Sequence, residues 1–116
     1  MNKAISNGLA VAKPWGECDA FDLILVWERS FWRVQVKSAW TPANSRVQIK
    51  SCYGEPPGKP YTRADIDFLV AYIAYADLCY VFPVAYLRNR TALTFYLDNP
   101  AYDDYREAWG LFRQRR

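Results

Sequence analysis

The most regular pattern of apolar and polar residues lies at residues 31–39, FWRVQVKSA, where Val34 and Val36 alternate with Gln35 and Lys37. Successive side chains of a β-strand point to opposite faces, so this spacing predicts a strand with one apolar and one polar face. The polar face either meets solvent or lines a site. The partners of the strand decide between these two possibilities.

Two more strands are predicted close to this one. Residues 21–27, FDLILVW, are nearly continuously apolar, which is typical of a strand buried on both faces. Residues 46–53, RVQIKSCY, repeat the alternating pattern. Turn-forming and charged residues at 28–30 and 41–45 separate the three segments, and links this short favour an antiparallel meander.

A helix is predicted over residues 61–77, YTRADIDFLVAYIAYAD. Thr62 followed three residues later by Asp65 is a variant of the capping box that opens many helices. Ile66 and Leu69 then begin an apolar series at helical spacing.

Shorter strands are predicted at residues 9–13, 78–84 and 92–97. A second helix is predicted at the end of the chain, because Asp98 or Asn99 can cap it and Pro100 suits its first position. This order of elements predicts an α/β (α+β) fold in which helices flank a mixed central sheet.

The residue types and motifs that the chain lacks exclude several kinds of catalytic site. The chain has no histidine, which removes the commonest general base, Ser-His and Cys-His nucleophile pairs, and most zinc enzymes. Cys18, Cys52 and Cys79 are odd in number and form no CxxC pair, so we expect reduced thiols in a cytoplasmic protein. Residues 1–116 are one domain by size, and a net charge of +3 is compatible with a polyanionic partner.

Neither a signal peptide nor a membrane segment is expected. The start of the chain, MNKAISNGLAVAKP, lacks a long apolar core. The most apolar helical segment, FLVAYIAYA, is too short to span a bilayer and has Asp65 and Asp67 beside it.

One group of polar residues suggests a chemical site. In a hairpin with its turn at residues 28–30, Asp22 at the start of one strand lies near Gln35 and Lys37 on the next. A carboxylate and an amide oxygen are hard ligands that suit Mg²⁺ or Mn²⁺. A lysine beside the metal can orient a water molecule and stabilise charge on a phosphoryl oxygen.

The pattern D-x(12)-Q-x-K in this strand-hairpin-strand context resembles the core of the PD-(D/E)XK nucleases. More narrowly, AKPWGECDAFDLILV, WRVQVKSAW and YTRADIDFLVAYIAYADLCYVFPV resemble the members related to group I intron homing enzymes and to archaeal Holliday junction resolvases. In the intron-associated members, a glutamine replaces the usual acidic residue of the second motif, as at Gln35. The resemblance covers roughly residues 9 to 97.

This resemblance implies a restriction-endonuclease-like fold and metal-dependent hydrolysis of DNA phosphodiester bonds, with Mg²⁺ or Mn²⁺ as cofactor. Asp22 would be the principal metal ligand, helped by the Gln35 side chain and the backbone carbonyl of Val36. Lys37 would position the attacking water, and Ser38 could bind a phosphate. Because one such site cuts one strand, a homo-dimer or higher homo-oligomer is expected.

The chain departs from the family pattern before its first strand. The family usually has a helix there with a glutamate that points into the site, and only MNKAISNG precedes Leu9. Either the chain begins late, or Glu17 substitutes, or activity is reduced or lost. Asp19 competes with Asp22 for the role of metal ligand, although Asp22 abuts the apolar strand and fits the pattern better.

Basic residues elsewhere are candidates for DNA contact, and solvated surface charge explains them almost as well. These candidates are Arg46, Lys50, Lys59, Arg88, Arg90, Arg113, Arg115 and Arg116. Three classes of function stay open: a nuclease, a DNA-binding relative that has lost a complete site, and an interaction protein with an aromatic surface and no metal affinity.

Overall fold

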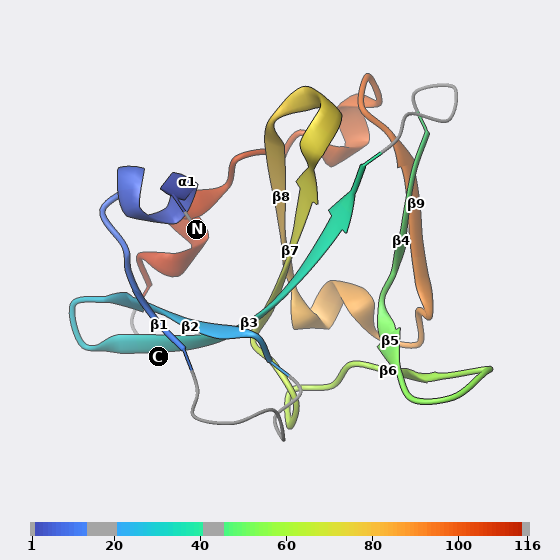
Figure 1. Cartoon of the computed structure of the whole chain (residues 1–116), viewed down its shortest axis with the longest axis horizontal. Coiled ribbons are helices and arrows are strands. Elements are labelled where there is room, and N and C mark those ends of the chain that lie inside the picture. Colours follow the sequence, from blue (N-terminus) through green and yellow to red (C-terminus); the bar gives the residue numbers. More distant parts are fainter. Residues whose placement is uncertain (1, 14–20, 41–45, 115–116) are drawn as a thin grey trace.

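The centre of the protein is a five-stranded sheet in the order β1–β2–β3–β7–β8 (Figure 1). The computed structural model describes residues 2–13, 21–40 and 46–114. Strands β3 and β7 run parallel, and the other neighbours in this sheet are antiparallel, so the sheet is mixed. The strands are β1 Ala10–Ala12, β2 Leu23–Trp27, β3 Ser30–Ala39, β7 Phe68–Ile73 and β8 Leu78–Pro83.

Two small antiparallel sheets and a few short helices complete the fold. Strand β4 pairs with β9, and β5 pairs with β6. These strands are β4 Arg46–Lys50, β5 Cys52–Tyr53, β6 Lys59–Pro60 and β9 Ala92–Tyr96. The helices are α1 Asn2–Ser6 and the 3₁₀ helices η1 Ala74–Ala76, η2 Val84–Leu87, η3 Pro100–Tyr102 and η4 Trp109–Phe112. The mixed α+β class predicted from the sequence is confirmed, with fewer and shorter helices than expected.

The β2–β3 hairpin forms as its sequence predicts. Leu23 pairs with Val34 at its open end, and Trp27 pairs with Ser30 next to the turn. Glu28 in the turn adopts a left-handed backbone with φ 52°. The strands predicted at 9–13, 78–84 and 92–97 are also present, as β1, β8 and β9.

The predicted meander is wrong in its third strand. Strand β4 does not pair with β3 but with β9, while the free edge of β3 pairs in parallel with β7. The reason lies in the two faces of β4, where Val47 and Ile49 are buried but Arg46 and Lys50 are exposed. A strand with one charged face fits a two-stranded sheet that has one solvent-exposed face. It does not fit the middle of a sheet that is buried on both faces.

The helix predicted over residues 61–77 is also wrong, although its starting signal does form. The Thr62 backbone N–H donates to Asp65 Oδ2 at 2.9 Å, and the Ala64 N–H donates to Thr62 Oγ1 at 3.3 Å. Only one turn follows, and the chain then enters β7, where five of six residues are buried. A continuous apolar run fits a central strand covered on both faces, and local capping does not outweigh that burial.

At the C-terminal end, the predicted long helix is replaced by two short 3₁₀ helices. Asn99 does cap the first of them, because its side chain accepts a hydrogen bond from the Ala101 N–H at 3.0 Å. The helix does not propagate because the segment instead pairs with β8: the Val81 N–H donates to the Tyr105 carbonyl at 2.8 Å. Glu107 then takes a left-handed backbone with φ 49°, which a helix cannot contain.

The large sheet is covered on both faces, and β7 contributes alternate side chains to each. Leu69 and Ala71 pack with the β4–β9 sheet, whereas Val70 packs on the opposite side with η4 (Figure 1). Val34 and Val36 of β3 face the same side as Val70. Strand alternation therefore turns Gln35 and Lys37 toward the side where the smaller sheets lie.

A five-residue helix precedes the first strand, where the sequence was expected to be too short for the glutamate-bearing helix of the family. Helix α1 buries Ala4, and Lys3 Nζ pairs with Glu107 Oε1 at 2.9 Å. Its five residues include no carboxylate, so it is not the glutamate-bearing helix of the family pattern. In the described part of the chain, no helix has the length and apolar character needed to cross a membrane.

Candidate active site

Asp22 is fixed at the open end of the β2–β3 hairpin. Its backbone N–H donates to the Val34 carbonyl at 2.9 Å, which continues the ladder one residue beyond β2. The Asp22 side chain is exposed and turns toward β3. The hairpin geometry therefore presents a carboxylate beside the polar face of β3.

Gln35 and Val36 hold this carboxylate in place through one of its oxygens. Asp22 Oδ2 accepts hydrogen bonds from Gln35 Nε2 at 2.9 Å and from the Val36 backbone N–H at 3.0 Å. Asp22 Oδ1 accepts no hydrogen bond from the described residues and stays available as an acceptor. Direct hydrogen bonds thus join Asp22 to both Gln35 and Val36.

Lys37 lies two residues further along the same face of β3. Its Nζ is 6.0 Å from the centre of the Tyr61 ring, close enough for a cation–π attraction. No carboxylate within the described ranges forms an ion pair with Lys37. A lysine that has no carboxylate partner keeps its three donors available for a water molecule or a phosphate.

Tyr61 belongs to this site, although it was not singled out from the sequence. Its side chain is 4% exposed and packs on Tyr53 with ring centres 5.4 Å apart. Burial raises the pKa of the Tyr61 phenol, and the negative charge of Asp22 raises that pKa further. The phenol therefore stays neutral near pH 7. The signal that marks this tyrosine in the sequence is its place at the head of YTRADIDF.

The oxygens at this site fit a hard divalent cation. Gln35 Nε2 lies 2.9 Å from Asp22 Oδ2 and 3.5 Å from the Val36 carbonyl oxygen, so the amide sits between two acceptors. Rotation of that amide about its last torsion would turn its own oxygen to the same place. One carboxylate, one amide oxygen and one carbonyl oxygen, with water, are a suitable set for Mg²⁺. Across residues 2–13, 21–40 and 46–114, no three side chains of His, Cys, Asp or Glu are grouped so that they could hold a metal ion.

The other predicted contacts are spread over the surface. Ser38 is exposed, and strand alternation places it on the face opposite Lys37. Arg46 and Lys50 are exposed on β4. Arg90 is engaged within the protein, since its Nε donates to the Tyr86 carbonyl at 2.8 Å and its guanidinium lies 4.6 Å from the Tyr86 ring centre.

Some predicted residues have other roles or cannot be placed. Arg113 Nη2 donates to the Asn7 carbonyl at 2.6 Å, which ties the C-terminal segment to the N-terminal one. Glu17 and Asp19, and with them the predicted turn at 41–45, lie outside the described residues. The same holds for Cys18, Arg115 and Arg116.

Comparison with known proteins gives two findings. A sequence profile described as PD-(D/E)XK endonuclease matches residues 1–110. Among solved structures, a bacterial homing endonuclease, I-Ssp6803I, is similar to the chain with a TM-score of 0.74 and 30% sequence identity. That match covers 95% of this chain and 82% of the other. No curated protein matches the chain.

Proposed function

The chain belongs to the PD-(D/E)XK endonuclease family, and from this premise we propose that it hydrolyses phosphodiester bonds of DNA with the help of Mg²⁺ or Mn²⁺. Asp22, Gln35 and the Val36 carbonyl hold the metal, and Lys37 is the catalytic amine. These residues lie on the hairpin inside the matched segment.

The observation that carries this proposal is the pair of hydrogen bonds to Asp22 Oδ2. They orient the carboxylate toward the same face that Lys37 shares with Gln35, and they leave Oδ1 open. A surface aspartate with only a structural role has no need of an adjacent unpaired lysine and a buried tyrosine. The combination is the one that phosphoryl chemistry needs: an oxygen-rich metal site beside a positive charge.

Each residue has a separate task in the proposed reaction. When bound, the metal supplies Lewis acidity at the phosphate and lowers the pKa of a nearby water. Lys37 orients the attacking water and stabilises the charge that develops on the phosphoryl oxygens. The Tyr61 ring attracts the Lys37 ammonium through a cation–π contact, and the buried ring excludes water from one side of the site.

The wider assignments follow from the same proposal. Exposed Arg46 and Lys50 supply positive charge for DNA phosphates on the β4 surface. One site cuts one strand, so two copies associate to cut both, as a homo-dimer or part of a higher homo-oligomer. Cys52 and Cys79 are buried free thiols, in keeping with a cytoplasmic location. One family match over residues 1–110 supports a single nuclease-like domain.

Metal dependence is the direct test. Purified protein incubated with supercoiled plasmid is expected to produce nicked circles in Mg²⁺ or Mn²⁺ and none in EDTA, because Asp22 alone cannot activate water. Calorimetry should detect Mn²⁺ binding without DNA. Equal nicking in EDTA would exclude the proposed mechanism. Metal and DNA binding without nicking would instead favour a DNA-binding relative that has lost catalysis.

Replacing Gln35 with Glu tests whether this side chain is a metal ligand. Without metal, two carboxylates would meet where an amide now donates at 2.9 Å, so we expect a loss of roughly 1 kcal/mol in the free energy of unfolding. With Mn²⁺, the second carboxylate should tighten binding by about tenfold. Thermal melts and calorimetry in EDTA and in Mn²⁺ measure both effects.

The matched control for this change is Gln48→Glu, which makes the same charge change at an exposed position of β4. It should alter neither stability in EDTA nor Mn²⁺ affinity. If Gln35→Glu leaves Mn²⁺ binding as unaffected as the control does, Gln35 is not a ligand.

A further inference from the structure

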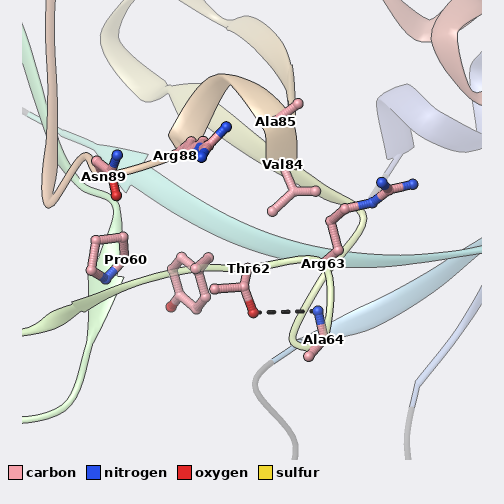
Figure 2. Close-up of a pocket in the computed structure, with 9 residues that line it drawn as sticks. Pro60, Thr62, Arg63, Ala64, Val84, Ala85, Arg88 and Asn89 are labelled. Carbon is pink, nitrogen blue, oxygen red and sulfur yellow. Dashed lines mark hydrogen bonds between the residues drawn. The ribbon is translucent and has the colours of Figure 1, made fainter.

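A groove of about 710 Å³ lies between the segment that ends β6 and the segment that begins with η2 (Figure 2). One wall is formed by residues 60–64 and the other by Val84, Ala85, Arg88 and Asn89. In Figure 2, Arg63 lies on one wall and Arg88 on the other, the Arg63 side chain points away from Arg88, and Val84 and Ala85 lie between the two residues in this view. The groove is of the size that small organic ligands occupy in proteins.

This groove is connected to the candidate active site through Tyr61. The same tyrosine lines the groove and carries Lys37 near its ring. Burial is the first cause of the raised pKa of the Tyr61 phenol, and the negative charge of Asp22 is the second. A strand of nucleic acid held at Asp22 can therefore continue over Tyr61 into the groove.

The two arginines of the groove have free side chains on a fixed backbone. Neither Arg63 nor Arg88 forms an ion pair within the described ranges, and both are exposed. The nearby Asp65 carboxylate is occupied, because Oδ2 accepts from the Thr62 N–H and from Thr62 Oγ1. The Arg63 carbonyl is itself held by Arg33 Nη2 at 2.6 Å.

Between the arginines, the lining is mostly apolar. Val84, Ala85, Ala64 and Pro60 supply aliphatic surface, and Asn89 adds an amide. Two unpaired guanidinium groups around an aliphatic floor match a ligand with anionic groups linked by an apolar body. A sugar-phosphate chain has that composition, and arginine binds phosphate oxygens in a bidentate manner.

We propose that this groove binds one or two nucleotides of the DNA strand beyond the phosphate that is cleaved. Arg63 and Arg88 each bind a phosphate, and the deoxyribose between these phosphates packs against Val84 and Ala85. The inference rests on the proposed nuclease function, because it takes DNA as the ligand. It assigns the groove a role in binding and none in the chemical step.

The test compares Arg63→Ala, Arg88→Ala and the double variant with wild type. Anisotropy of a labelled duplex measures DNA affinity in EDTA, and plasmid nicking in Mg²⁺ gives kcat and KM. Each single change should weaken DNA binding roughly tenfold and reduce the slope of log affinity against log salt by about 1. KM should rise with kcat largely unchanged.

Arg29→Ala is the matched control, because Arg29 is exposed in the hairpin turn at the end opposite Asp22. It removes the same charge outside the groove and should have little effect on DNA affinity. Circular dichroism melts establish that all variants fold. If the groove variants bind DNA as the control does, the inference is overturned.

The outcomes separate this inference from the proposed function. Nicking by wild type with no effect of the groove variants rejects the groove alone. No nicking, but weaker DNA binding in the groove variants, rejects catalysis and supports the groove. Polyglutamate that displaces DNA, and whose own affinity depends equally on Arg63 and Arg88, would reassign the groove to acidic polypeptides.

Discussion

Replacement of Lys37 by Ala is expected to lower the rate of DNA nicking by about 10²–10³-fold and to leave Mn²⁺ affinity nearly unchanged. Lysine is not a metal ligand, so the oxygens of Asp22 and Gln35 should still bind the ion. What the variant lacks is the positive charge that orients water and stabilises the phosphoryl oxygens. The loss should therefore appear in kcat, with little change in KM.

Asp22→Asn gives the complementary result. The amide keeps the shape of the side chain but removes the negative charge, so both Mn²⁺ binding and nicking should be lost. Calorimetry and single-turnover nicking of plasmid measure the two quantities on the same preparations.

A Lys37→Ala protein that nicks DNA at the wild-type rate would show that Lys37 only faces solvent.

Lys37→Arg separates charge from geometry. Arginine keeps the positive charge but carries it on a planar group that cannot place a single ammonium donor on a water molecule. We expect it to restore little of the rate, while DNA binding should match wild type. Full restoration would mean that Lys37 contributes only general electrostatic attraction for DNA.

The part of the site that the sequence predicted well depends on contacts that are local in the chain. Asp22 and Gln35 are joined by one hairpin, and strand alternation alone puts Lys37 on the same face as Gln35. Tyr61 reaches the same site from across the fold. Its position depends on the pairing of β3 with β7, which no local pattern specifies.

The difference between local and long-range contacts also explains which elements of the fold were predicted wrongly. The run FLVAYI has apolar residues at helical spacing, but it has them at every other spacing too, so its periodicity does not discriminate. Its state is decided by the open edge of β3, which needs a parallel partner with two apolar faces. The capping bonds between Thr62 and Asp65 then serve a turn that leads into β7.

The contact between Asp67 and Arg33 is a long-range contact on which the fold depends. Asp67→Ala should therefore lower the free energy of unfolding by about 3 kcal/mol. Asp67 Oδ2 accepts from the Arg33 backbone N–H at 2.8 Å, and Oδ1 accepts from Arg33 Nη2 at 3.2 Å. The Asp67 side chain is 11% exposed and the Arg33 side chain 28% exposed, so removal of the carboxylate leaves a partly buried guanidinium without its counter-charge.

The backbone of Asp67 extends the same network in two directions. Its N–H donates to the Arg33 carbonyl at 2.9 Å, and its carbonyl accepts from the Val84 N–H at 3.0 Å, where η2 begins. Arg33 in turn holds the Ala64 carbonyl at 2.9 Å. Both walls of the groove are therefore attached to the start of the β3–β7 pair.

Urea unfolding monitored by tryptophan fluorescence measures the loss of stability. Asp104→Ala is the matched control, because that carboxylate is exposed, and it should change stability by less than about 0.5 kcal/mol. Asp67→Asn should cost less than Asp67→Ala, since its amide oxygen can still accept from Arg33. An Asp67→Ala protein as stable as the control would mean that the β3–β7 pair is held by apolar packing alone. A destabilised Asp67→Ala protein should also bind DNA more weakly, because the arginines of the groove lose their fixed backbone.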